Sequence, residues 1–132
     1  MSDVGAWEPA PKLGPLHAQA LDVAAAEATN DTLAVDSDVA ACLRQVFTAT
    51  PDERAGLFDG ERSRRLVGWA RALTLAEETI PGCEAGAKSP VIALARILRA
   101  RGDYPHDLTP WIRRVSSNRF LPYGSLMDRL QS

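Results

Sequence analysis

The side chains best suited to metal ligation are two histidines and two cysteines, which are spread widely along the chain. They are His17, Cys42, Cys83 and His106, and no two of them have the short spacing of a structural zinc site. The sequence contains no HExxH motif, no EF-hand loop and no Glu-x-x-His pair of the kind that holds iron in helical bundles. We therefore expect no metal site.

Phosphate binding and nucleophilic catalysis also find little support. The glycine motifs GxxxxGK[ST] and GxGxxG, whose backbone N–H groups bind phosphates, are both absent. Cys42 lies among apolar neighbours of a predicted helix, which favours a buried thiol, and the charge of Glu84 is expected to raise the pKa of the Cys83 thiol. We assign no catalytic or cofactor-binding residue, expect no cofactor and predict that the protein is not an enzyme.

One histidine keeps an enzymatic alternative open. His106 is followed directly by Asp107, and a carboxylate beside an imidazole can orient the ring for general acid–base chemistry. Local His–Asp contacts are far more common as surface turns. A small enzyme that uses His106 with Asp107 or Tyr123 is therefore the second alternative function.

The charge of the chain is divided unevenly between its two halves. The net charge is −2, yet residues 1–53 hold nine acids and two bases, whereas residues 54–132 hold thirteen bases and eight acids. Two halves of opposite sign are expected to attract each other within one fold. The alternative interpretation is a basic face for nucleic acid or for an acidic partner.

Nucleic-acid binding by the Arg-rich C-terminal third is the first alternative function. Residues 89–132 hold seven Arg and three Asp, and helices predicted over 89–101 and 109–118 have the order of a helix-turn-helix. However, their connection over 102–108 is longer than the three or four residues of that motif. The charges also lie in the second half of the supposed recognition helix, whereas base contacts usually come from its first turns.

The strongest candidate for a binding surface is a cluster of aromatic and arginine residues over 104–123. Four of the eight aromatic residues of the chain fall in this stretch, and aromatics with Arg are enriched where proteins bind one another. The alternative is that Trp111 and Phe120 point inward and close one end of the hydrophobic core. The candidate partner-binding residues are Tyr104, His106, Trp111, Arg113, Arg114, Asn118, Arg119, Phe120 and Tyr123.

Helices must position these residues, because apolar side chains recur every three or four positions along most of the chain. The predicted apolar stripe of the longest helix, from Asp59 to Ile80, is Leu66, Trp69, Leu73, Ala76 and Ile80. The predicted stripe of the first helix, from Leu16 to the Asn-Asp pair at 30–31, is Leu16, Ala20, Val23, Ala24 and Glu27. No segment alternates apolar and polar residues over the length of a strand.

Three helix starts combine a capping hydroxyl with a following proline, at Thr50, Ser89 and Thr109. The hydroxyl can accept a free N–H of the first turn, and proline fixes a helical φ where no N–H is needed. Glu53 completes a capping box with Thr50. A further helix is expected to start near Asp36 or Ser37, either of which can cap it, and a last short one over 125–130.

These patterns predict an all-α protein, with five or six helices in a single compact domain over residues 15–132. Their unequal lengths favour an irregular, orthogonal-type bundle. Residues 1–14, with Trp7 and several prolines, are predicted to form a flexible N-terminal arm. We find no secretory signal and no apolar stretch of about 20 residues, the length that a membrane span needs.

We therefore predict a non-enzymatic helical protein-binding or adaptor module. Its partner would be another protein or a second copy of itself, contacted around residues 104–123, with no membrane involved. The acidic N-terminal half offers a possible second surface. Two unpaired thiols favour a reducing cytoplasm, and the excess of Arg over Lys, 13 to 2, favours a bacterial source.

Overall fold

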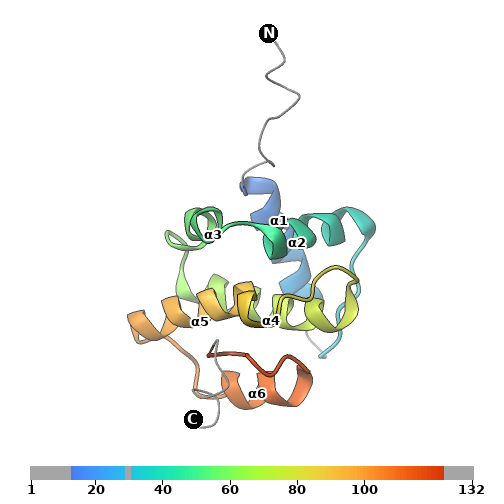
Figure 1. Ribbon diagram of the computed structural model, residues 1–132. Coiled ribbons are helices and arrows are strands. Elements are labelled where there is room, and N and C mark those ends of the chain that lie inside the picture. Colours follow the sequence, from blue (N-terminus) through green and yellow to red (C-terminus); the bar gives the residue numbers. More distant parts are fainter. Residues whose placement is uncertain (1–12, 29–30, 124–132) are drawn as a thin grey trace.

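The structure is a computed structural model that describes residues 13–28 and 31–123. Within these ranges the chain is helical and contains no strand, which confirms the all-α prediction. The long helix α4 is central and contacts α1, α5 and α6, while α2 packs on α1 (Figure 1). The elements are α1 (Pro15–Glu27), α2 (Ser37–Thr48), α3 (Pro51–Phe58), α4 (Ser63–Thr79), the short 3₁₀ helix η3 (Gly86–Lys88), α5 (Pro90–Arg101) and α6 (Leu108–Val115).

The predicted apolar stripe of α4 is buried throughout, from Leu66 to Ile80. The helix also buries Ala70, Ala72 and Leu75, which lie off that stripe. It is enclosed on several sides because α1, α5 and α6 all pack against it. A helix that is apolar over most of its circumference belongs at the centre of a fold.

Two of the three predicted helix starts are confirmed. Thr50 accepts the backbone N–H of Glu53 at 3.1 Å, and the Glu53 carboxylate accepts the backbone N–H of Thr50 at 2.8 Å. Ser89 accepts the backbone N–H of Val91 at 3.2 Å. Gly102 ends α5 in the left-handed region, with a φ of 76°, as expected of a glycine at this position.

Two other predicted starts are wrong by a few residues. Asp59 does not cap α4, which begins at Ser63, because Asp59 continues the helical turn at the end of α3. Thr109 does not cap α6, which begins at Leu108 after Asp107. The Thr109 hydroxyl bonds the hydroxyl of Tyr104 instead, at 2.6 Å.

The inward face predicted for α1 is only partly correct, because Ala20 and Ala24 are buried but the other three predicted positions are exposed. Leu16 is 70% exposed and Val23 is 48% exposed, and Glu27 faces solvent as well. The buried face contains His17 and Leu21 instead. The buried face of α1 is therefore shifted toward His17 and Leu21 from the predicted face.

A buried histidine accounts for this shift of the buried face. The ring Nδ1 of His17 accepts the backbone N–H of Gly14 at 3.0 Å and so completes the first turn of the helix. Its Nε2 then carries the hydrogen and donates to the side-chain oxygen of Gln45 on α2. Both ring nitrogens are satisfied, which is the condition under which a histidine is stable in the interior.

Asp22 joins the acidic N-terminal half to the basic C-terminal half. Its carboxylate pairs with Arg65 of α4 at 2.6 Å and accepts the indole N–H of Trp69 at 2.8 Å. The Arg65 guanidinium also lies over the Trp69 ring, 5.0 Å from its centroid. These contacts support the interpretation that the two halves attract each other within the fold.

Asp31 makes the same kind of contact with α6. It pairs with Arg114 at 2.9 Å and accepts the indole N–H of Trp111 at 2.8 Å. Arg71 lies over the Trp111 ring, 5.0 Å from its centroid. Asp31 has a positive φ of 61°, a conformation that aspartate tolerates better than most residues.

Several predictions fall outside the described residues. These are Trp7, most of the N-terminal arm and the short helix over 125–130. Of the predicted arm, Leu13 and Gly14 are described, and Leu13 packs against the core. No helix in the described ranges has the length and apolar character needed to cross a membrane.

Candidate functional site

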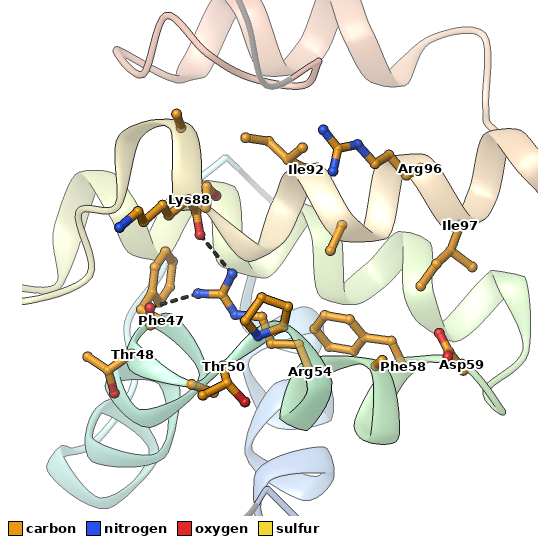
Figure 2. Close-up of a pocket in the computed structure, with 16 residues that line it drawn as sticks. Phe47, Thr48, Thr50, Arg54, Phe58, Asp59, Lys88, Ile92, Arg96 and Ile97 are labelled. Atoms are coloured by element: carbon orange, nitrogen blue, oxygen red, sulfur yellow. Dashed lines mark hydrogen bonds between the residues drawn. The ribbon is translucent and has the colours of Figure 1, made fainter.

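An open groove of about 840 Å³ runs between α3 and α5 (Figure 2). Its surface is mainly apolar. The fully buried ring of Phe58 lies along it, 5.9 Å from the ring of Trp69 beneath. The lining residues are Phe47, Thr48, Ala49, Thr50, Pro51, Arg54, Ala55, Phe58, Asp59, Ala87, Lys88, Ser89, Ile92, Ala93, Arg96 and Ile97.

Two arginines tie α3 to α5, one at each end of the groove. At the start of both helices, Arg54 donates to the carbonyl oxygen of Lys88 at 2.7 Å. At their far ends, Arg101 donates to the carbonyl oxygens of Asp59 at 2.9 Å and Glu61 at 2.7 Å. The two helices therefore run in the same direction, and the groove lies between two fixed ends.

Arg54 is 8% exposed and uses its guanidinium to hold backbone (Figure 2). Besides Lys88, it donates to the carbonyl oxygens of Val46 at 3.0 Å and Phe47 at 2.7 Å, near the C-terminus of α2. Burial lowers the pKa of Arg54, and the charge of Glu77 opposes that shift. One side chain thus fixes the end of α2, the start of α3 and the segment before α5.

A buried carboxylate lies under the start of α5. Glu77 accepts hydrogen bonds from the Ser89 hydroxyl and from the Asn118 amide, the latter at 2.9 Å. Asn118 also donates to the carbonyl oxygen of Gly86 at 3.0 Å. Burial raises the pKa of Glu77, against the effect of the two hydrogen bonds. The network holds the groove-lining segment before α5 against α4.

The rim of the groove carries cations without acidic partners. Lys88 and Arg96 are exposed, and within the described residues neither side chain makes a hydrogen bond or an ion pair. Arg54 adds a third positive charge to the lining, and Asp59 is its one acidic residue. The groove is therefore apolar along its length and net positive.

The predicted surface over 104–123 is divided between buried and exposed side chains. Tyr104, Trp111, Arg113, Asn118, Phe120 and Tyr123 are half-buried. Most of these residues have structural contacts: Trp111 donates to Asp31, Asn118 bonds Glu77, and Phe120 packs against the core.

Two arginines near this surface, Arg99 and Arg114, are also engaged in the fold. Arg99 lies between two rings, 4.6 Å from the centroid of Tyr104 and 4.1 Å from that of Tyr123. Arg114 pairs with Asp31 while remaining largely exposed, and Arg119 is exposed. Arg99 and Arg114 are therefore already in contact with other side chains of the fold, which leaves fewer free cations for nucleic acid than the sequence alone indicates.

His106 lies on an exposed turn before α6. It does not line the groove between α3 and α5, nor a smaller cavity of about 430 Å³ bordered by α1 and α3. Its neighbour Asp107 is engaged by Arg71 at 3.5 Å.

The cysteines differ in environment. Cys83 is fully buried, and this burial raises the pKa of its thiol to about 11, with a smaller contribution from Glu84. The predicted direction of the shift is confirmed, although desolvation is its main cause. Cys42 is half-buried rather than fully buried. Among the described residues no three His, Cys, Asp or Glu side chains are grouped closely enough to hold a metal ion.

Sequence reasoning missed the groove. Arg54 stands in α3, a short helix whose start at Thr50 is predicted correctly. Two features of the sequence could have indicated the groove. One is Arg54 in the middle of a short helix, and the other is the pair of apolar residues Ala93 and Ile97 on α5. Comparison with known proteins found no matching family model, curated protein or solved structure.

Proposed function

We propose that this chain is a non-enzymatic protein-binding module that holds one amphipathic helical segment of a partner protein in the groove between α3 and α5. The observation that carries the proposal is the groove itself. It is open, apolar along its length and fixed at both ends by Arg54 and Arg101. A preformed apolar groove is how many helical modules receive a helix from another protein.

The dimensions of the groove support a short helical occupant. The twelve residues of α5 span about 18 Å at 1.5 Å per residue, which is the length of about three helical turns. Such a segment would present apolar side chains at positions i, i+4 and i+7 toward Ile92, Ala93 and Ile97. The unpaired charges of Lys88 and Arg96 favour a segment that is acidic beside its apolar face.

A bacterial cytoplasm is part of the proposal, on the basis of the free thiols and the Arg-rich composition. The exposed residues His106, Arg114 and Arg119 remain a predicted second contact region. If that region were the main site, Arg113→Glu combined with Arg119→Glu would reduce partner binding, whereas substitutions in the groove would have no effect.

The test uses helical 18-residue peptides selected from a display library against the whole protein. Affinity is measured by fluorescence polarisation. Ala93→Trp fills the groove and is expected to weaken binding at least tenfold. Ala100→Trp is the matched control, because Ala100 is exposed on the same helix and does not line the groove. Its affinity should equal that of the wild type.

The proposal fails if the selection yields no peptide that binds, or if Ala93→Trp and Ala100→Trp bind the selected peptides equally well. Circular dichroism on both variants shows that they keep their helical content. A segment that binds while Ala93→Trp has no effect would show that another surface of the molecule is used.

A further inference from the structure

We infer that the bound segment carries two acidic side chains seven or eight residues apart, which pair with Lys88 and Arg96. This inference rests on the proposed function and specifies the chemistry of the partner. Its basis is the arrangement of charge along one side of the groove, which differs from the arrangement along the other side.

Both unpaired cations lie on the α5 side of the groove. Lys88 stands just before α5 and Arg96 stands in its second half, so they are eight residues apart and both line the groove (Figure 2). The six steps from Pro90 to Arg96 rise about 9 Å at 1.5 Å per residue, and the non-helical step from Lys88 to Pro90 adds a few Å, so the separation is about two turns of helix or slightly more. A partner helix lying along α5 reaches this separation with acids at i and i+7 or i+8.

The α3 side offers no matching cation. Arg54 is the basic residue of α3 that lines the groove, and its guanidinium is committed to three backbone carbonyl oxygens. Asp59 follows α3 and would repel an acid placed on that side. The segment therefore needs its acids on the flank that faces α5, next to an apolar stripe directed at Ile92 and Ile97.

Internal ion pairing does not satisfy these cations. Other arginines of the fold have acidic partners, such as Arg65 with Asp22 and Arg114 with Asp31. Lys88 and Arg96 have none within the described residues. Charges on the rim of an apolar site contribute mainly to selectivity and to the rate of association, both of which weaken as salt is added.

The test compares synthetic 18-residue peptides that share one apolar face, taken from the tightest selected binder. One peptide carries Glu at both flank positions, one carries Gln at both, and one carries two Glu residues only four positions apart. Each favourable exposed pair is expected to change affinity about two- to fivefold. The first peptide should therefore bind about 4- to 25-fold tighter than the Gln peptide at low salt, and the advantage should shrink in 0.5 M NaCl.

Charge reversal in the protein completes the test. Lys88→Glu and Arg96→Glu should each weaken the peptide with two spaced acids by about three- to tenfold, since repulsion replaces attraction. Neither variant should weaken the Gln peptide. Arg64→Glu is the matched control, because Arg64 is an exposed arginine that lies outside the groove, and it should leave all affinities unchanged.

The inference is overturned if the Gln peptide binds as tightly as the spaced diacid, or if Arg64→Glu has the same effect as the rim variants. If Ala93→Trp still abolishes binding in that case, the groove stands as the site and only the charge pattern is wrong. If Ala93→Trp has no effect on any peptide, the proposed function itself fails.

Discussion

Arg54 and Glu77 are two buried charged residues on the groove side of the molecule, and their surroundings differ. Arg54 donates to three backbone carbonyl oxygens. Glu77 accepts from Ser89 and Asn118 side chains. The attraction between the two charges opposes the effect of burial on the pKa of Arg54. Together they fix the elements that border the groove.

Replacing Arg54 with Met should lower the free energy of unfolding by about 2–4 kcal/mol, because buried carbonyl oxygens would lose their donors. Arg54→Lys should recover only part of this loss, since a single ammonium cannot match the planar fork of a guanidinium. Urea unfolding followed by circular dichroism measures both. Equal stability of wild type and Arg54→Met would show that the three hydrogen bonds contribute nothing.

Glu77 predicts a pH dependence of stability. Burial raises its pKa above the ordinary value of 4.5, so between the two values the folded chain binds more protons than the unfolded chain. Stability then falls as pH rises from 4.5 through the pKa of the folded state. Glu77→Gln has no such proton to lose, and its amide oxygen can accept from Asn118 while its NH2 donates to the Ser89 hydroxyl.

As pH rises from 4.5 to 7, the free energy of unfolding of Glu77→Gln should therefore increase relative to that of the wild type. Urea unfolding at several pH values gives this difference directly, and Glu84→Gln is the control because Glu84 is exposed. A difference that stays constant, or that moves in favour of wild type with rising pH, would contradict the assigned environment of Glu77.

At the scale of elements, α1 shows two faces that are hard to tell apart from sequence. Both faces carry leucine, yet Leu21 is buried with no exposed surface and Leu16 is 70% exposed. The face with Leu21 is the buried one because His17, on the same side of the helix, bonds Gly14 in the first turn and Gln45 on α2.

The matched substitutions Leu21→Ala and Leu16→Ala test the orientation of α1. Leu21→Ala should cost about 2–5 kcal/mol, as expected for a buried leucine. Leu16→Ala should change stability by less than about 0.5 kcal/mol, which is the usual range for an exposed site. Denaturant unfolding separates the two outcomes. The reverse order would show that α1 is turned to the originally predicted face.

Local signals explain which helix starts could be predicted. The hydroxyl, proline and glutamate of residues 50–53 all act within one turn, and Ser89 does the same for α5. Asp59 and Thr109 also have side chains that can cap a helix, but neither caps one here. Asp59 lies at the end of α3, and Thr109 lies within α6 and bonds Tyr104. The end of α3 is held by Arg101, about forty residues away in sequence, and no local pattern contains that information.

The groove was beyond prediction for the same reason. Its lining comes from the end of α2, from α3, and from η3 and α5, so it exists only once α3 and α5 lie side by side. The 104–123 cluster was conspicuous in the sequence because its residues are contiguous. In the structure Trp111 and Asn118 serve contacts with Asp31 and Glu77, which lie far away in the chain.

At the scale of the whole molecule, some of the opposite charges of the acidic and basic halves pair with each other within the fold. Asp22 and Asp31 of the acidic half each hold an arginine and a tryptophan indole N–H of the basic half. The ion pairs themselves are exposed, so each contributes little. The indole contact of the fully buried Trp69 is more important, because an unpaired buried donor is costly.

Asp22→Ala should therefore lower the free energy of unfolding by about 1–3 kcal/mol, because the indole N–H of Trp69 loses its acceptor. Asp38→Ala is the control of equal charge, since Asp38 is exposed and has no ion pair in the described structure. Urea unfolding compares the two. Equal effects would show that overall charge, rather than this contact, links the halves.

The groove between α3 and α5 is the central claim, and the four isoleucines of the chain allow a direct measurement of its occupancy. Ile92 and Ile97 line the groove, whereas Ile80 and Ile112 are buried elsewhere. NMR spectra of isoleucine δ1-methyl groups, recorded during titration with a selected helical peptide, should show shifts for Ile92 and Ile97 and little change for the other two. Shifts confined to Ile80 or Ile112, with Ile92 and Ile97 unmoved, would contradict the account.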